Sequence, residues 1–575
     1  MPPNNESPPV ASPNELTPLN RQNVHDTNNF HEFINVHDND HGGENIELHR
    51  HLSLFDLVCI GVGATVGSGI YVVTGLIAHT LAGPATFISW SIAGLAACAS
   101  GLCYAEQGGR FPSAGSTYVY AKETMGERAS VVAACCLTLE YVGSASAVAR
   151  SWGDKVVEYV KSLEGSGAES DGVSYLLRVL DPGMGINPCA FLVSSAAVLL
   201  LLNGVKESKF VTNLFTTLNV TLLLFMAGLA LLLAKADNMS PLIPPQFGVS
   251  GIIRGATSSF FGYIGFDEIC CIAGEAVDPA KNMPRAIILT LVIVTSLYIT
   301  ASIGLVGMVP YEEISETSGF PNGFRYRSLN WAAQIAALGE LVALPFVVLV
   351  TIMAQPRLQY AMARDGILPP IFAEVDEFGN LINGLKISGA LMTAVATLIP
   401  FAYLDDLISS GILIAFTITD ASVILVRRKS PANRPYLLKH LLMAYMAASL
   451  LSGFLLRSWL SNGETRGAVL VLTVLSCVGT VALGYLMQNQ CESEKPMIQG
   501  LFLTPFVPIL PLVGIFINLY LIAQLELTGL LLISGYVGLC FAMYLHSKRS
   551  KTESRRKGHT KEPLERLISL HDAKR

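Results

Sequence analysis

The sequence is poor in charged residues. Asp, Glu, Lys and Arg make up 14% of its 575 residues, whereas a soluble domain usually carries about 25%. Hydrophobic residues reach 51%, and they gather in runs of roughly 20, the length of a membrane-spanning helix. This composition excludes an ordinary soluble protein and predicts an all-α protein that crosses a membrane many times.

The apolar runs predict about fourteen membrane-spanning helices. The fourth run is short and the tenth and eleventh are weak, so the lower bound is about twelve. The predicted cores are 54–75, 86–106, 131–150, 189–203, 211–234, 255–273, 285–308, 333–355, 386–403, 407–426, 437–456, 467–487, 502–523 and 527–546.

The first 50 residues contain no long apolar run, so no cleavable signal peptide is expected. Residues 1–50 are rich in Pro, Asn, His and acids, which predicts a disordered cytoplasmic tail. Residues 547–575 form a second, basic tail. Basic residues such as Arg427, Arg428 and Lys429 fall in predicted inner loops, which places both termini in the cytoplasm by the positive-inside rule.

No motif for covalent or metal chemistry stands out. The eleven cysteines include two vicinal pairs, Cys135–Cys136 and Cys270–Cys271, but no second cluster accompanies them. A zinc site or redox motif needs such a cluster, and no nucleophile–base set is evident. We therefore expect no enzyme, no metal, no cofactor and no nucleic-acid partner.

Two of the apolar runs are interrupted by glycines. Gly67-Ser68-Gly69 lies in the middle of residues 57–76, and Gly262 and Gly265 lie within residues 259–275. A membrane tolerates unwound backbone only where protein buries it or where it lines a cavity. Broken helices at matching places in two halves indicate a transporter's substrate site. The chain is therefore predicted to be a secondary transporter, with a ten-helix core at 51–430 and about four additional helices at 431–546.

The breaks offer groups that suit an amino acid headgroup. Backbone N–H groups around Gly67–Gly69 would lack helical partners and could bind a carboxylate. Free carbonyls across the break, and those of Phe261, Gly262 and Ile264, could bind an ammonium group. Alternatively, glycines can serve only close helix packing. Phe261 could gate access or simply pack.

Acidic residues within the predicted spans are the other candidates. Glu140 lies mid-span, and Arg150 is about 15 Å further along the same helix, too far to pair with it. An intramembrane acid is normally functional, so Glu140 could contact a cationic side chain or titrate; it could also be a protonated packing residue. Asp420 has the same open roles. Asp267 and Glu268 follow the second break and are expected to face an inner vestibule.

Five motifs carry a family resemblance. They are GVGATVGSGIYVVTG (61–75), FPSAGSTYVYA (111–121), LEYVGSASAVARSW (139–152), FFGYIGFDE (260–268) and MAQPRLQYAMARDGILP (353–369). Together they resemble the cationic amino acid transporter family of the amino acid–polyamine–organocation superfamily, over about residues 50–545.

The resemblance implies a leucine-transporter-like 5+5 inverted repeat and alternating access. In the family, the substrate carboxylate binds at positions matching Ser68 and Gly69, and the amine binds carbonyls matching Thr65, Phe261, Gly262 and Ile264. Glu140 matches a glutamate near the substrate side chain, and Phe261 matches a gate. The expected substrate-binding residues are Thr65, Val66, Gly67, Ser68, Gly69, Ile70, Glu140, Phe261, Gly262 and Ile264.

One position departs from the proton-coupled relatives. Bacterial members place a lysine in the fifth helix, where this chain has Asn219. An asparagine does not titrate, so proton coupling by that route is not expected. Facilitated exchange, or coupling through Glu140 or Asp420, stays open.

The resulting hypothesis is a permease for arginine, lysine or ornithine in a lipid bilayer. A broad or neutral amino acid permease, with protons as a second ligand, is the alternative, and a non-transporting amino acid sensor is a further one. The plasma membrane is favoured over a vacuolar or lysosomal membrane. The sequence predicts no oligomeric state.

Overall fold

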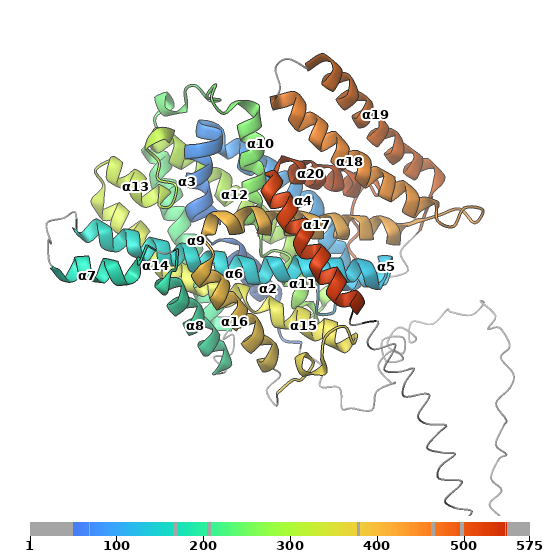
Figure 1. Cartoon of the computed structure of the whole chain (residues 1–575), viewed down its shortest axis with the longest axis horizontal. Helices are drawn as coiled ribbons and strands as arrows, with labels where there is room; N and C mark the ends of the chain where they lie inside the picture. Colours follow the sequence, from blue (N-terminus) through green and yellow to red (C-terminus); the bar gives the residue numbers. More distant parts are fainter. Residues whose placement is uncertain are drawn as a thin grey trace, which may run out of the picture. The chain divides into compact units, whose positions relative to one another are not determined.

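The computed structural model is almost entirely helical (Figure 1). It describes residues 50–67, 69–164, 171–183, 185–203, 209–376, 380–461, 466–494, 500–546 and 548. The predicted tails lie outside these ranges, except for Arg50 and Lys548.

The first part of the chain forms α-helices joined by short π- and 3₁₀-helical segments. They are α2 (Leu54–Thr65), η1 (Gly69–Val73), α3 (Thr74–Ile77), η2 (Ala78–Ala82), η3 (Gly83–Ala85), α4 (Thr86–Arg110), α5 (Thr117–Met125), α6 (Glu127–Glu164), α7 (Asp171–Leu180), α8 (Pro188–Leu202), α9 (Lys209–Leu232) and η4 (Ala236–Met239).

The middle part repeats this pattern of a broken helix followed by long ones. It contains α10 (Gly248–Ser259), η5 (Phe260–Tyr263), α11 (Glu268–Cys271), η6 (Ala273–Glu275), α12 (Pro279–Met308), η7 (Tyr311–Glu313), α13 (Gly319–Tyr326), α14 (Asn330–Thr351), α15 (Ala354–Arg364), η8 (Pro370–Phe372), α16 (Ile382–Leu398) and α17 (Phe401–Arg427).

The last part is attached through a two-stranded antiparallel ladder that pairs β1 (Arg428–Lys429) with β2 (Glu492–Ser493). Its helices are α18 (Leu437–Ser461), α19 (Arg466–Gln490), α20 (Ile509–Gln524) and the helix Leu527–His546. Helices α18 and α19 lie side by side, drawn in orange and brown in Figure 1.

Nine helices in the described part of the chain are long and apolar enough to cross a membrane. Three shorter apolar helices, α8, α16 and α20, accompany them. The prediction of an all-α polytopic membrane protein is thereby confirmed. The count of fourteen spans and the inverted 5+5 relation stay predictions.

Burial differs sharply between the core and the last helices. The most apolar stretch of α6 is 78% buried inside the protein, whereas that of α19 is only 11% buried. An apolar surface left uncovered by protein is suited to contact with lipid. Helices α18 and α19 and the helix Leu527–His546 therefore add a lipid-facing layer, whereas most of α20 is buried.

Both predicted helix breaks are present. Helix α2 starts with a capping box between Ser53 and Asp56 and ends at Thr65, after which Val66 takes non-helical angles (φ −79°, ψ 87°). The chain resumes as the π-helix η1 at Gly69. In the second break, α10 runs through η5 into Ile264, whose backbone is extended (φ −63°, ψ 139°).

Candidate functional site

The two breaks press against each other. A Cβ atom placed on Gly69 would lie 2.4 Å from the Cα of Gly262, and one on Gly265 would lie 2.7 Å from the carbonyl carbon of Ala64. Gly265 also has φ +116°, a conformation that other residues rarely adopt. Only glycine fits at these crossing points, so the sequence dictates how closely the broken helices approach.

A cluster of three aromatic residues, Trp90, Tyr263 and Tyr298, packs against the crossing. The ring of Trp90 on α4 lies 4.7 Å from that of Tyr298 and 5.9 Å from that of Tyr263, centroid to centroid. The Tyr263 hydroxyl donates to the Trp90 carbonyl at 3.1 Å. A Cβ on Gly262 would lie 2.5 Å from the Trp90 ring. Because Gly262 has no side chain, the backbone of the second break can contact the Trp90 ring directly.

Neighbouring helices hold the carbonyl groups that the first break sets free. Tyr298 donates its hydroxyl to the Thr65 carbonyl at 2.7 Å, and the Asn219 side-chain amide donates to the Val66 carbonyl at 2.6 Å. Asn219 in turn accepts a hydrogen bond from the Tyr71 hydroxyl, beyond the break. Each carbonyl oxygen has two lone pairs, and the Tyr298 hydroxyl occupies one of the two on Thr65.

Glu140 lies buried on α6 beside the second break. Neither of its carboxyl oxygens receives a hydrogen bond from a donor group in the described part of the protein. A second buried carboxyl group, that of Asp267, lies near it and accepts a hydrogen bond from Tyr141 at 3.1 Å. Two carboxyl groups can share a hydrogen bond only when one of them carries a proton. The arrangement can therefore take either a proton or a ligand cation.

The expectation that Asp267 and Glu268 face an inner vestibule is wrong. Their side chains are 0% and 3% exposed, respectively. The turn after Gly265 directs them into the protein, where they stand near Glu140. The second break thus brings three acids together rather than one.

Phe261 is buried and packs edge-on against Phe401 at the start of α17, with 5.4 Å between ring centroids. The other predicted residues occupy several places around the crossing. Gly67 lies against Val347 of α14, Ile70 and Ile264 are buried, and Ser68 lies outside the described residues.

Asp420 has different surroundings from Glu140. It accepts hydrogen bonds from Ser100 on α4 at 2.9 Å and from Asn518 on α20 at 3.3 Å. Gly514 on α20 leaves room for it, because a Cβ there would lie 2.5 Å from the Asp420 carboxyl oxygen. Asp420 therefore joins the last helices to the core, and these partners are not residues of the breaks.

Sequence reasoning missed the residues that support the breaks, Trp90, Tyr71 and Tyr298. An aromatic side chain in an apolar helix gives no signal that separates such a role from ordinary packing. It also missed the buried pair of Lys155 on α6 with Glu340 on α14. There a signal was available for Glu340, an acid within an apolar helix, whereas Lys155 lies in a polar stretch of α6 beside Asp154.

These features define a class: a polytopic membrane protein in which two broken helices cross beside a group of buried acidic residues. The sequence profile of the amino acid permease family matches residues 52–525, and that of the permease C-terminus matches residues 502–551.

Known proteins resemble the chain over most of its length. It is 32% identical to the vacuolar cationic amino acid transporter 4 of Arabidopsis thaliana, over 83% of this chain and 88% of that one. It is 36% identical to the methylthioribose transporter of Bacillus subtilis, over 67% and 82%. It is 32% identical to the branched-chain amino acid permease BcaP of the same bacterium, over 67% and 82%.

The chain belongs to the amino acid permease family, and within it to the cationic amino acid transporters of the amino acid–polyamine–organocation superfamily. The five sequence motifs predicted this membership, which is confirmed. The protein is accordingly a transporter and not an enzyme.

Proposed function

We propose that the protein moves cationic L-amino acids, namely arginine, lysine and ornithine, by alternating access. The substrate headgroup binds where the two broken helices cross. The observation that carries the proposal is Glu140 next to that crossing, a buried carboxyl group to which no described residue donates a hydrogen bond. A guanidinium or ammonium group would supply the missing donors and the opposite charge.

The crossing suits the two ends of an α-amino acid. The π-helix η1 begins at Gly69, and the first N–H groups of a helix have no partner within it, so they can bind the carboxylate. The amine is bound by carbonyl groups of Thr65, Phe261, Gly262 and Ile264. Phe261 acts as the gate by leaving its contact with Phe401.

If transport is coupled to protons, the protons bind at the buried acids Glu140 and Asp267. Asn219 meets the first break with a side chain that does not titrate. Glu140 and Asp267 form a pair that can share a proton. Coupling through this pair favours a second candidate function, a broad or neutral permease in which Glu140 holds a proton instead of the substrate; one relative is named as a branched-chain amino acid permease.

Both termini are placed in the cytoplasm, and the plasma membrane is the proposed location. A relative named as vacuolar makes the vacuolar membrane the alternative. Imaging of the tagged full-length protein distinguishes the two.

Uptake of radiolabelled arginine into liposomes tests the proposed substrate class. Wild type is compared with Glu140→Gln, which keeps the shape and removes the charge, and leucine and alanine serve as competitors. Loss of a charge-assisted hydrogen bond predicts at least about tenfold lower arginine uptake with neutral uptake kept. If neutral amino acids compete fully and Glu140→Gln leaves arginine uptake unchanged, the cationic assignment fails.

A further inference from the structure

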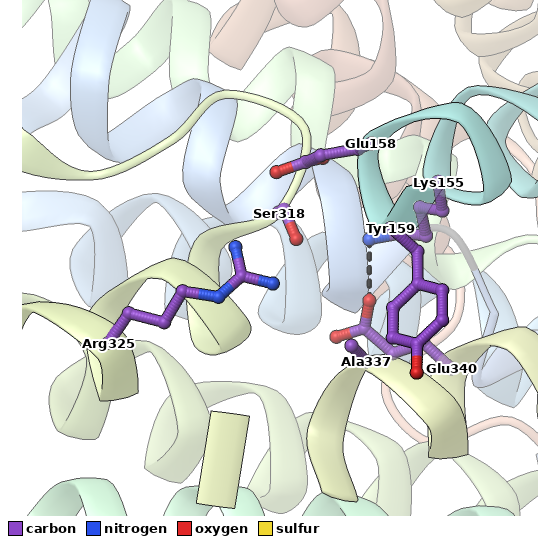
Figure 2. A pocket seen from close by; sticks show the side chains of 7 residues that line it. All are labelled: Lys155, Glu158, Tyr159, Ser318, Arg325, Ala337 and Glu340. Atoms are coloured by element: carbon purple, nitrogen blue, oxygen red, sulfur yellow. Dashed lines mark hydrogen bonds and ion pairs between the residues drawn. The ribbon is translucent and has the colours of Figure 1, made fainter. Parts of the chain in front are cut away.

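A second charged pocket lies away from the crossing, near the end of α6 (Figure 2). Its cavity volume is about 10 Å³, which is room for about one water molecule. A cationic side-chain end can therefore enter only where a lining side chain, such as that of Lys155, gives way. Its lining residues are Lys155, Glu158, Tyr159, Ser318, Arg325, Ala337 and Glu340.

A buried ion pair forms one wall. The Lys155 ammonium lies 2.6 Å from a Glu340 carboxyl oxygen, and the two side chains are 4% and 1% exposed. Lys155 also donates to the Thr317 carbonyl at 2.8 Å and approaches the Tyr71 carbonyl of η1 at 3.5 Å. One cation thus ties α6 to α14, to the segment before α13 and to the helix that follows the first break.

The pair leaves part of Glu340 unused. Its second carboxyl oxygen is buried and has no hydrogen-bond partner in the described part of the protein. Figure 2 shows this carboxylate facing the pocket, with Arg325 directed toward it from the opposite side. A buried carboxylate oxygen without a donor is costly, so the pocket has one acceptor ready for a cationic ligand.

We propose that this pocket is an entry site for cationic amino acids, in which the substrate's guanidinium or ammonium group takes the place of Lys155 on Glu340. This inference rests on the proposed function. Glu158 offers a second carboxylate to the substrate cation, and Arg325 binds the substrate carboxylate. Removing one partner of a buried ion pair is strongly unfavourable, so a ligand without a side-chain cation cannot replace Lys155.

The exchange connects entry with the central site. When Lys155 leaves Glu340, its contacts with Thr317 and Tyr71 loosen, which frees the segment after the first break. Glu140 precedes Lys155 by fifteen residues on the continuous helix α6, about 22 Å and four turns plus about 60° away. Lys155 at the entrance and Glu140 at the centre therefore lie along nearly the same side of one helix.

Substrate kinetics test the entry site. Glu340→Gln can still accept a hydrogen bond from Lys155, but it lacks the charge that holds the substrate cation. We expect its KM for arginine to rise about tenfold with kcat within about twofold, and uptake of a neutral substrate to be unchanged. The matched control is Lys161→Met on the same helix, which breaks the exposed pair with Asp181 and should leave the KM unchanged. An equal KM change for neutral and cationic substrates, or no change, would overturn the proposal.

A labelling experiment measures the site without transport. Ala337→Cys, one turn from Glu340 on α14, is treated in intact cells with a membrane-impermeant thiol reagent, and the wild type gives the background from native cysteines. Arginine should slow the labelling of Ala337→Cys several-fold more than leucine does. The same difference is expected in the double variant that carries both Ala337→Cys and Glu140→Gln. Loss of this protection in Glu340→Gln supports the site, and absence of protection in the parent refutes it. If the wild type takes up no arginine, the proposed function fails, while protection still reports on the pocket.

Discussion

Asn219 is a neutral clamp across the first helix break. Its amide nitrogen holds the Val66 carbonyl before the break, and its amide oxygen accepts the Tyr71 hydroxyl after the break. A side-chain amide can donate and accept at once, whereas a lysine only donates and a carboxylate only accepts. The clamp is therefore independent of pH, and the unwound backbone keeps its partners in every protonation state of the protein.

Replacing this amide tests the clamp. Asn219→Ala leaves the Val66 carbonyl and the Tyr71 hydroxyl without these partners in a buried site. A buried group without a partner costs about 1–3 kcal/mol, so we expect a lower unfolding temperature in detergent and about tenfold lower arginine uptake. Thr217→Ala, on an exposed position of the same helix, is the control. Full stability and uptake in Asn219→Ala would contradict the clamp.

Among the acids, the sequence indicates which residues are candidates for a functional role, but not what surrounds them. Glu140 could be predicted, because an acid in a membrane span is rare. Its pairing with Asp267 could not, because the contact depends on the turn at Gly265, 125 residues later in the chain. Asp420 looked equivalent to Glu140 in sequence, yet its carboxylate accepts hydrogen bonds from Ser100 and Asn518.

At the scale of the helices, the crossing of the two breaks depends on glycines that nothing larger can replace. In Gly69→Ala the new methyl group would meet the backbone of Gly262 at 2.4 Å, and a backbone atom cannot rotate away. Overpacking typically costs about 1–3 kcal/mol. We expect Gly69→Ala to lower the unfolding temperature and to abolish arginine uptake.

The matched control is Gly228→Ala on α9, where an added Cβ would meet no atom within 4 Å. Alanine is better than glycine in a helix by about 1 kcal/mol, so this variant should transport normally and be as stable as the wild type or more so. If Gly69→Ala matches Gly228→Ala in unfolding temperature and arginine uptake, the two breaks do not approach each other as closely as described.

The breaks were predictable because a membrane forbids unwound backbone except in special places. The side chains that pack against the breaks were harder to predict from the sequence. The Trp90 cluster and the Lys155–Glu340 pair join helices that are far apart in sequence, and the pair spans 185 residues. Periodicity within one helix carries no information on which other helix covers it.

At the scale of the whole molecule, the last helices are fixed to the core through Arg428. In the sequence, Arg427, Arg428 and Lys429 look alike, as basic residues of a predicted inner loop. In the structure they differ: Arg427 pairs with Glu106 at 3.2 Å, Lys429 is exposed, and Arg428 is 7% exposed. Two of the three basic residues that indicated an inner loop, Arg427 and Arg428, thus make contacts within the protein.

Arg428 binds groups on both sides of the link between α19 and α20. Its guanidinium donates to the carbonyl groups of Gln488, Cys491 and Val507 and to the Gln488 side chain, at 2.7–3.2 Å. The planar fork of an arginine can serve several acceptors together, which a lysine cannot. The residue therefore sets where α20 begins, and α20 carries Asn518 to Asp420.

Arg428→Ala should loosen this attachment without touching the substrate site. Several acceptors lose a charged donor, each at a cost of about 1–3 kcal/mol where it stays buried. We expect a clearly lower unfolding temperature, partial recovery in Arg428→Lys, and an unchanged KM for arginine in the folded fraction. Lys429→Ala removes the neighbouring, exposed charge and should change neither quantity. A raised KM with full stability in Arg428→Ala would mean instead that the last helices act on the transport site itself, and equal behaviour of Arg428→Ala and Lys429→Ala would mean that Arg428 holds nothing in place.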